Sequence, residues 1–311
     1  DIYAHGLRMW LDKPWFGFGY GSFESAFYRT YAVWREATAG AEPLFTEMGH
    51  PHNEFLLWAI EGGIVPLLGL LLIMGLVLRL LYRLPWAQSL AWLGVLSPIF
   101  IHSQTEFPFY HSLAHWWMIL VLIFVMDAQY GQRRLLAAPP AWSRWPMRAW
   151  GLGMMLFMIT GLYASQQITH YAKQEQISAT KLQQVINPWI WYDRMGFYRH
   201  HVQLTQGLLQ QDKRQLLDYV GWAKRFLTHT PRAGIYYNAY LALAMAEEEE
   251  AAQQLLEEAR HLYPNVQLLR SASILRARER LAVITDDMTA TELNDNIPLY
   301  DTLRSAIGGA Y

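Results

Sequence analysis

The chain has 311 residues, of which 53% are hydrophobic and only 16% are charged, against roughly a quarter charged in an ordinary soluble domain. The formal net charge is −1 and no basic stripe is present, so nucleic acid is not an expected partner. The absence of cysteine excludes disulfides, zinc–thiolate sites and cysteine nucleophiles. Residue 1 is Asp and no signal peptide precedes it, and we expect further membrane spans before this chain.

The apolar residues concentrate between residues 55 and 166, whereas residues 167–311 have the composition of a soluble helical domain. A transmembrane helix needs about 20 predominantly apolar residues. The candidate spans are Phe55–Leu78, Gln88–Ser103, Phe109–Met126 and Trp145–Ala164. The second and third are short, so we expect a packed bundle to hold them. Glu61 lies inside the first span and needs an internal hydrogen-bond partner.

The distribution of basic residues predicts the orientation of these spans. Basic residues fill the links after the first and third spans: Arg79, Arg83, Arg133, Arg134, Arg144 and Arg148. The connection Gln104–Pro108, between the second and third spans, carries none. Because cytoplasmic loops are enriched in Lys and Arg, both basic links are predicted to be cytoplasmic. Residues 1–54, the Gln104–Pro108 connection and the C-terminal region then lie on the outer side.

The C-terminal region shows helical periodicity. Apolar residues recur at helical spacing from Tyr236 to Ala244 and again from Ala251 to Leu262, with the acidic run Glu247–Glu250 between the two segments. Pro264 ends the second segment. This pattern predicts an αα-hairpin, the unit of tetratricopeptide-like folds, although three clean repeats are not present.

These patterns together predict an all-α protein, in which a polytopic transmembrane helix bundle is followed by a helical-hairpin, tetratricopeptide-like domain. The predicted domains are an interfacial loop region at residues 1–54, a four-span bundle at residues 55–166 and a helical domain at residues 167–311.

Two polar clusters lie next to the predicted spans. The first occupies residues 47–54 and contains Glu47, His50, His52, Asn53 and Glu54. The second contains His102, Gln104, Glu106, Tyr110, His111 and His115. Ionisable groups at a membrane boundary are costly and indicate function by default. Because the predicted topology puts both clusters on the outer side, we expect them to converge on one site.

Three motifs resemble the O-antigen ligase and polymerase superfamily. His52-Asn53, followed after nine residues by Gly63, is similar to its His-[Asn/Ser/Gln]-x9-Gly signature, and residues 14–23 resemble its Pro-x-x-Gly-x-Gly-x-Gly-x-Phe element. The stretch from Gln104 to Ser112, with His115-Trp116 after it, is similar to the bacterial O-oligosaccharyltransferase branch that glycosylates pilins and other envelope proteins.

This resemblance implies a multi-pass enzyme of the bacterial inner membrane, with its active site and C-terminal domain in the periplasm. Such enzymes transfer an oligosaccharide from a polyprenyl diphosphate to a hydroxyl, with inversion and without a metal or other cofactor. The implied partners are the lipid-linked oligosaccharide, an acceptor protein such as a pilin, and membrane lipids. His52 is the implied general base, a role typically worth 10²–10⁴-fold.

The remaining site residues follow from the same resemblance and from their chemistry. Catalytic roles are predicted for His52, Tyr110 and Gln104, the last two as hydrogen-bonding groups that position the acceptor or the diphosphate. Substrate-binding roles are predicted for Arg29, Arg35, Glu106, His115 and Asn53. The two arginines suit a diphosphate, which accepts charge-assisted hydrogen bonds.

Four alternatives stay open at this point. The acceptor hydroxyl can belong to a sugar, as in an O-antigen ligase or polymerase. The protein can instead transport the lipid-linked glycan, or serve only as a membrane anchor for a helical scaffold. Finally, His50 and His52 with Glu47 and Glu54 have the ligand types of a zinc site.

Overall fold

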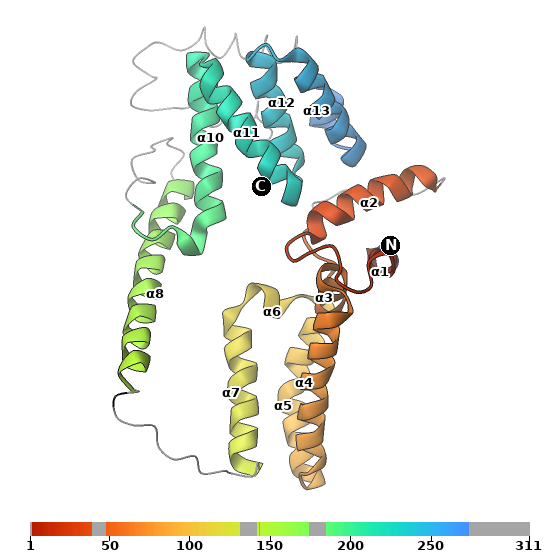
Figure 1. Ribbon diagram of the computed structural model, residues 1–311, viewed down its shortest axis with the longest axis vertical. Coiled ribbons are helices and arrows are strands. Elements are labelled where there is room, and N and C mark those ends of the chain that lie inside the picture. The colour runs from red at the N-terminus through yellow and green to blue at the C-terminus, as the bar shows by residue number, and fades with distance from the viewer. Residues whose placement is uncertain (1, 39–47, 131–141, 143, 174–184, 274–311) are drawn as a thin grey trace. The chain divides into compact units, whose positions relative to one another are not determined.

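A computed structural model describes residues 2–38, 48–130, 142, 144–173 and 185–273. Every regular element in these ranges is a helix, which confirms the predicted all-α class (Figure 1). The chain divides into two compact units, Asp1–Leu136 and Ala137–Tyr311. The boundaries predicted at residues 54 and 166 concern the side of a membrane on which each segment lies, so this division does not test them.

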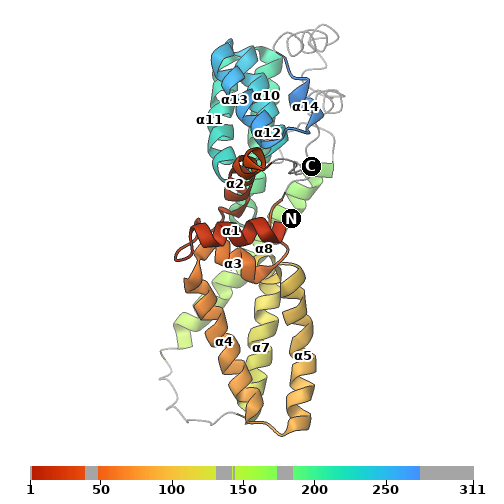
Figure 2. The same ribbon diagram turned by 90° about the vertical axis from the view of Figure 1, so that its right-hand side faces the viewer.

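The first unit is built from two groups of helices. Its elements are α1 (Ile2–Asp12), α2 (Phe23–Ala37), α3 (Glu54–Gly62), α4 (Ile64–Tyr82), α5 (Trp86–Thr105), α6 (Pro108–His111) and α7 (Leu113–Tyr130). Helices α4, α5 and α7 contact one another and run side by side (Figures 1 and 2). At one end of these three, α1 lies across their direction and contacts α2 and α3 (Figure 2).

Two described helices, α4 and α7, are long and apolar enough to cross a membrane by length and composition. Their mean hydropathies over an 18-residue window are 2.6 and 1.4, and only 6% of each window is buried. Their exposed side chains include Leu72 and Phe124, 65% and 71% exposed. Helices α5 and α8 (Arg144–Lys173) coincide with the other two predicted spans, but they do not satisfy the same criterion. The four-span bundle therefore stays a prediction.

The first predicted span is not one helix, because the chain breaks at Gly63. Gly63 has φ +70°, a conformation that L-residues with a side chain rarely adopt. A Cβ atom there would lie 2.3 Å from the backbone of Trp15, so the close approach also requires glycine. Ile64 N–H then donates to the Pro14 carbonyl at 2.8 Å and starts α4 in a new direction. Apolar composition is continuous across this break, which is why composition alone predicted a single span.

The same break places Glu61 on α3, outside the candidate span α4. Its carboxylate is 2% exposed and accepts a hydrogen bond from Phe23 N–H, the first residue of α2, at 3.0 Å. The predicted internal partner of Glu61 is therefore confirmed. Burial raises the pKa of this carboxyl, while the hydrogen bonds from Phe23 and Gly21 act in the opposite direction. Because the first N–H groups of a helix have no partner within it, Glu61 completes the start of α2.

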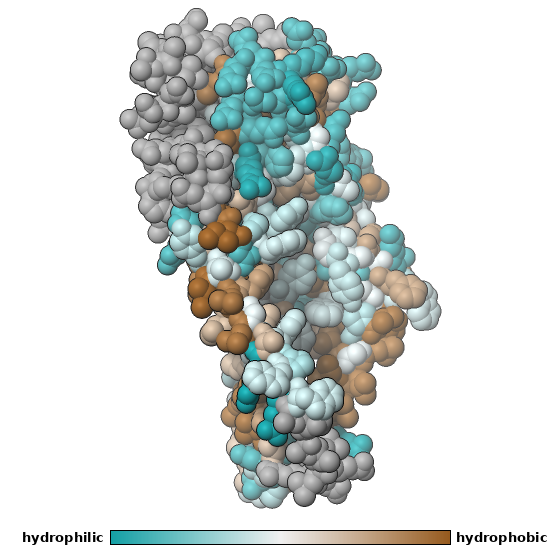
Figure 3. All heavy atoms as spheres, turned by 60° about the vertical axis from the view of Figure 1, so that its left-hand side comes forward, coloured by the Kyte–Doolittle hydropathy of each residue, from teal (hydrophilic) through white to brown (hydrophobic). Residues whose placement is uncertain are grey.

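The second unit begins with α8 and continues through η2 (Trp189–Trp191), α10 (Tyr192–Gln210), α11 (Lys213–His229), α12 (Ala233–Met245), α13 (Glu249–Leu262) and α14 (Gln267–Arg270). From α10 to α13, each helix contacts the next. Polar residues gather over these helices at the top of Figure 3.

Helix α12 is the core of the second unit, because every residue from Gly234 to Ala244 is buried. It packs against α13, and the intervening residue Glu247 has φ 63°. Residues 247–250 are all exposed, as expected of a solvated turn. The predicted αα-hairpin is therefore confirmed, whereas its likeness to tetratricopeptide repeats stays a prediction.

Candidate functional site

Asn53 joins the predicted His motif to the end of α5. Its Oδ1 accepts the Leu56 N–H at 2.9 Å, so Asn53 is the N-cap of α3. The Nδ2 group of the same side chain donates to the Gln104 carbonyl at 3.2 Å and lies 3.4 Å from the Gln104 side-chain oxygen. A single amide thus starts one helix and holds it against another. The two predicted polar clusters therefore meet, as expected.

The neighbouring residue Glu54 connects α3 to α6. Both of its carboxylate oxygens accept hydrogen bonds from the protein. Its side chain is 2% exposed. One carboxylate oxygen accepts from Trp58 Nε1 and the other from Phe109 N–H, both at 3.0 Å. Phe109 lies in the first turn of α6, so this carboxylate completes the start of α6 as Glu61 completes that of α2. Residues 54 and 61 lie about two turns apart on one face of α3.

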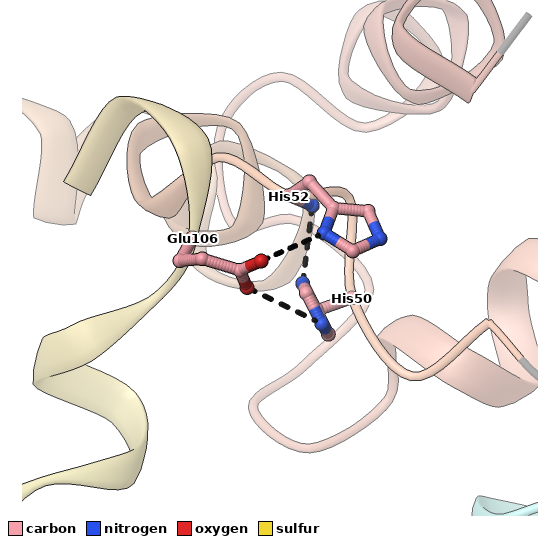
Figure 4. A group of neighbouring side chains, drawn as sticks. All are labelled: His50, His52 and Glu106. Carbon is pink, nitrogen blue, oxygen red and sulfur yellow. Dashed lines mark hydrogen bonds and ion pairs between the residues drawn. The ribbon is translucent and has the colours of Figure 1, made fainter. Parts of the chain in front are cut away.

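Three ionisable side chains gather beside this junction: His50, His52 and Glu106 (Figure 4). His52 Nδ1 lies 3.4 Å from one oxygen of Glu106, and His50 Nε2 lies 3.8 Å from the other. His50 packs on the ring of Phe107, with centroids 3.6 Å apart. The side chains of His52 and Glu106 are 47% and 46% exposed, so a substrate can reach them.

The hydrogen bonds determine which nitrogen of each ring carries the proton. The backbone N–H of His52 donates to His50 Nδ1 at 3.1 Å, so neutral His50 has its proton on Nε2, facing Glu106. The Glu106 carboxylate can only accept, so His52 presents a proton on Nδ1 to it. Neutral His52 therefore keeps its lone pair on Nε2, the nitrogen directed away from Glu106 in Figure 4. That arrangement suits a general base.

The backbone of His52 adopts an unusual conformation with a specific support. Its φ is +51°, in the left-handed region that few non-glycine residues occupy. The hydroxyl of Tyr3, on α1, donates to the His52 carbonyl at 3.2 Å. The sequence did not predict this contact, because no pattern connects two residues 49 positions apart. The hydrogen bond from the His52 backbone to His50 was not predicted either.

The cluster also has the composition of a three-ligand metal site. One ligand atom from each of His50, His52 and Glu106 lies within 4.8 Å of the others. Zinc in catalytic sites takes three such ligands and an open position. This set differs from the predicted alternative, because the Glu54 carboxylate is occupied by Trp58 and Phe109. Glu47 lies outside the described residues.

The other predicted site residues lie at varying distances from this cluster. Gln104 and Asn53 adjoin it through the hydrogen bonds described above. Tyr110 is half-exposed on α6, next to Phe107, with ring centroids 5.9 Å apart. Burial raises the pKa of the Tyr110 hydroxyl, and the negative charge of Glu61 acts in the same direction.

His115 lies on α7 and the two arginines lie on α2. The His115 ring meets the edge of His102 at 5.4 Å, and its buried Nδ1 has no hydrogen-bond partner among the described residues. Arg29 and Arg35 both lie on α2, which contacts α3. Binding of the diphosphate by these two residues stays a prediction. The side chain of His111 lies outside the described residues.

The apolar helices and the polar cluster at their end define a class: helical proteins with candidate membrane spans and a titratable site where those spans end. Residues 90–274 match the family described as "Virulence factor membrane-bound polymerase, C-terminal". Because this match covers more than half of the chain, the chain belongs to that family and is membrane-bound. Residues 1–74, which include His52, match the family described as "O-Antigen ligase". No curated protein and no solved structure matches the chain.

Proposed function

We propose that this protein transfers an oligosaccharide from a polyprenyl diphosphate to the hydroxyl of a Ser or Thr in an envelope protein such as a pilin. The observation that carries the proposal is the His52–Glu106 pair, which leaves Nε2 of His52 as an accessible base. The two family matches support the broader activity, that of a membrane-bound glycan ligase or polymerase.

In the proposed reaction, the acceptor oxygen attacks the anomeric carbon of the lipid-linked sugar. The bond from that carbon to the diphosphate oxygen breaks, and the lipid diphosphate leaves with the bonding electrons. The hydroxyl proton passes to Nε2 of His52. Glu106 stabilises the resulting imidazolium, because its carboxylate faces the protonated Nδ1. Attack from the face opposite the leaving group inverts the anomeric configuration.

The remaining predicted residues bind the two substrates in this proposal. Gln104 and Tyr110 position the reacting groups by hydrogen bonds, and Asn53 holds Gln104 in place. Arg29 and Arg35 bind the diphosphate, whose charge grows as it leaves. His115 lies on the same side of the spans by the predicted topology and is assigned to substrate binding. The site and the C-terminal helices lie in the periplasm in this scheme.

A sugar hydroxyl is the competing acceptor, and the two family descriptions favour it because they name a ligase and a polymerase. The chemistry of His52 is the same for either acceptor. A transporter would need polar groups at mid-depth on several spans. The described polar cluster instead gathers where α5 ends and α3 begins.

The proposal is tested with the full-length protein in vesicles that contain the lipid-linked glycan. One sample receives a pilin with a candidate Ser or Thr, and a second receives a glycan acceptor. A mass increase on the Ser or Thr supports the proposal, and its loss in His52→Ala shows that the base is required. His229→Ala is the matched control, because His229 is an exposed histidine at the end of α11. Extension of the glycan alone would establish the ligase or polymerase.

A further inference from the structure

Helix α1 carries an exposed apolar face. Tyr3, Leu7 and Leu11 recur every fourth residue and therefore share one side of the helix. They are 50%, 48% and 63% exposed, so the described residues of the chain leave this side largely uncovered. Scattered exposed apolar residues are ordinary, but an aligned set on an amphipathic helix indicates a partner.

The other sides of α1 are already occupied. One side packs on α2, where His5 meets the edge of Phe27 at 5.0 Å and Arg8 lies over the ring of Trp34. Another packs on α3 at Gly6. Successive helical residues are about 100° apart, so Leu7 lies about 160° from His5 and about 100° from Arg8 around the helix. The apolar face is therefore turned away from α2.

The position of α1 relative to α4 indicates what covers this face. The 19 residues of α4 span about 28 Å, close to the roughly 30 Å thickness of the hydrocarbon layer. Ile64, the first residue of α4, accordingly lies at one boundary of that layer. Its N–H donates to the carbonyl of Pro14, two residues after the end of α1. The chain just after α1 is thus attached to the boundary.

The residues that link α1 to this boundary have the composition of an interfacial segment. Trp15 and Phe16 follow Pro14 directly and are 68% and 79% exposed. Aromatic residues such as Trp and Tyr are enriched where hydrocarbon meets water. Exposed apolar side chains therefore occur on α1, in the segment that follows it and on α4. Helix α1 also lies across the direction of α4 (Figure 2).

We infer that α1 lies flat in the membrane interface, with Tyr3, Leu7 and Leu11 in contact with lipid. An amphipathic helix in this position buries its apolar side at the boundary between headgroups and acyl chains. Lipid is the occupant because the segment that follows α1 is hydrogen-bonded to the first residue of a candidate span in a membrane-bound protein. Since Tyr3 also donates to the His52 carbonyl, the depth of α1 sets the depth of the His52 loop.

These 311 residues contain no cysteine, so single nitroxide labels provide a direct test once any cysteine elsewhere in the full-length protein is replaced by serine. The full-length protein is labelled at Leu7→Cys or Leu11→Cys and reconstituted in vesicles of phosphatidylethanolamine and phosphatidylglycerol. Leu72→Cys, on the exposed side of α4, is the lipid-facing control. Asp12→Cys, an exposed polar position on α1, is the control expected to face water. The collision rates of each label with oxygen and with a water-soluble nickel chelate are measured.

We expect the logarithm of the oxygen-to-nickel collision ratio to be positive at positions 7, 11 and 72, and negative at position 12. Negative values at positions 7 and 11 would place α1 in water and overturn the inference. Protection of both labels from both reagents would mean that another protein chain covers this face, which also overturns it. The measurement needs no transfer activity, so its outcome is independent of the proposed function.

Discussion

The two units of this protein are both helical, but they are held together in different ways. In the second unit, each helix from α10 to α13 packs on the next along the chain, around the buried helix α12. In the first unit, the polar contacts that build the site join residues 51 to 55 positions apart. These contacts are Asn53–Gln104, His52–Glu106 and Glu54–Phe109.

These two kinds of contact differ in how well they tolerate substitutions. Contacts between consecutive helices need only a periodic apolar face, which tolerates many substitutions that preserve volume. Polar contacts between distant segments need one particular donor and one particular acceptor, and a buried group left unpaired is costly. Substitutions in the first unit should therefore change the reaction, whereas those in the second should change stability or the choice of acceptor.

The largest effect is expected from His52→Asn. The Asn side chain can imitate the Nδ1 group that faces Glu106, but it has no counterpart of the basic Nε2. Transfer should fall by at least about two orders of magnitude, the low end for the loss of a general base. The rate of glycan transfer in vesicles is the measurement. Near wild-type transfer by this variant would remove the proposed base.

A chelator provides the control for the metal alternative at the same cluster. Transfer by the wild-type protein should be unaffected by EDTA. Added Zn²⁺ should inhibit it, because a metal on His50, His52 and Glu106 would occupy the site. Loss of activity with EDTA and recovery with Zn²⁺ would instead favour the metal site.

The next effect concerns the part of the second unit that follows α8. We expect a chain ending at residue 173, the last residue of α8, to lose about tenfold or more in transfer to a folded acceptor. That loss corresponds to a docking contribution of about 1.4 kcal/mol or more. Transfer to a short unstructured peptide should be retained, since the clustered histidines lie in the first unit. Equal loss with both acceptors would show that the second unit completes the active site.

A smaller effect is expected from Glu106→Gln. Glu106 is half-exposed, so its charge-assisted hydrogen bond to His52 is expected to be worth about 1.4 kcal/mol, or about tenfold in kcat. The rate of glycan transfer in vesicles is the measurement, and an unchanged rate would show that Glu106 does not support His52. The variant keeps His50, the other histidine that faces this carboxylate.

Substitutions at two helix N-caps, one in each unit, give the most direct comparison of the units. Asn53→Ala removes the cap of α3, at a cost of about 1 kcal/mol, and also the bond to Gln104. Asn53→Asp keeps the cap but replaces the donor to Gln104 with an oxygen that the Gln104 carbonyl repels. Among the described residues, the side chain of Asp212, the cap of α11, accepts from Arg214 and Gln215 nearby. Both Asn53 variants should lower transfer, while Asp212→Ala should lower only the melting temperature. An equal loss of transfer in Asp212→Ala would contradict the comparison.

The smallest effect is a dependence of α1 packing on pH. Burial, followed by the charge of Arg8, lowers the pKa of His5 from 6.5 to about 4. The Thr30 hydroxyl donates to the Ala26 carbonyl, so its oxygen accepts from Nε2 of His5, at 2.9 Å. Protonation must then occur at Nδ1, which is buried without a partner among the described residues.

Between pH 6.5 and 4 the unfolded chain binds a proton at His5 that the folded chain does not, so stability falls as the pH falls through this window. The protection factors of amides in α1 and α2, in which the intrinsic slowing of exchange at lower pH has been divided out, should therefore decrease with acidification in the wild type. His5→Gln keeps a donor for Thr30 and does not titrate, so its protection factors should change less. The same pH dependence in both proteins would assign the effect to other groups.

Contacts between consecutive helices could be predicted from the sequence, whereas most contacts between distant segments could not. The hairpin of α12 and α13 was predictable, because Tyr236, Leu256 and their neighbours repeat at helical spacing and pack on adjacent elements. The convergence of the two polar clusters, one with His52 and the other with Glu106, followed from the predicted topology, whereas the contact between these two side chains was not predicted. The caps that Glu54 and Glu61 provide were not predictable, since each depends on a backbone N–H that no local pattern identifies. The break at Gly63 was missed because apolar composition continues through it.

Helix α3 has nine residues, and this number matters to the site as well as the identity of Glu54 and Glu61. It starts at its cap Asn53 and ends before Gly63, so the nine unspecified positions between Asn and Gly in the motif are the helix itself. One inserted residue would rotate one end of α3 against the other by about 100° and lengthen it by about 1.5 Å. Glu54 and Glu61 could then no longer reach α6 and α2 together. An insertion or deletion within α3 should therefore disrupt the site more than a substitution at a position of this helix other than Glu54 and Glu61.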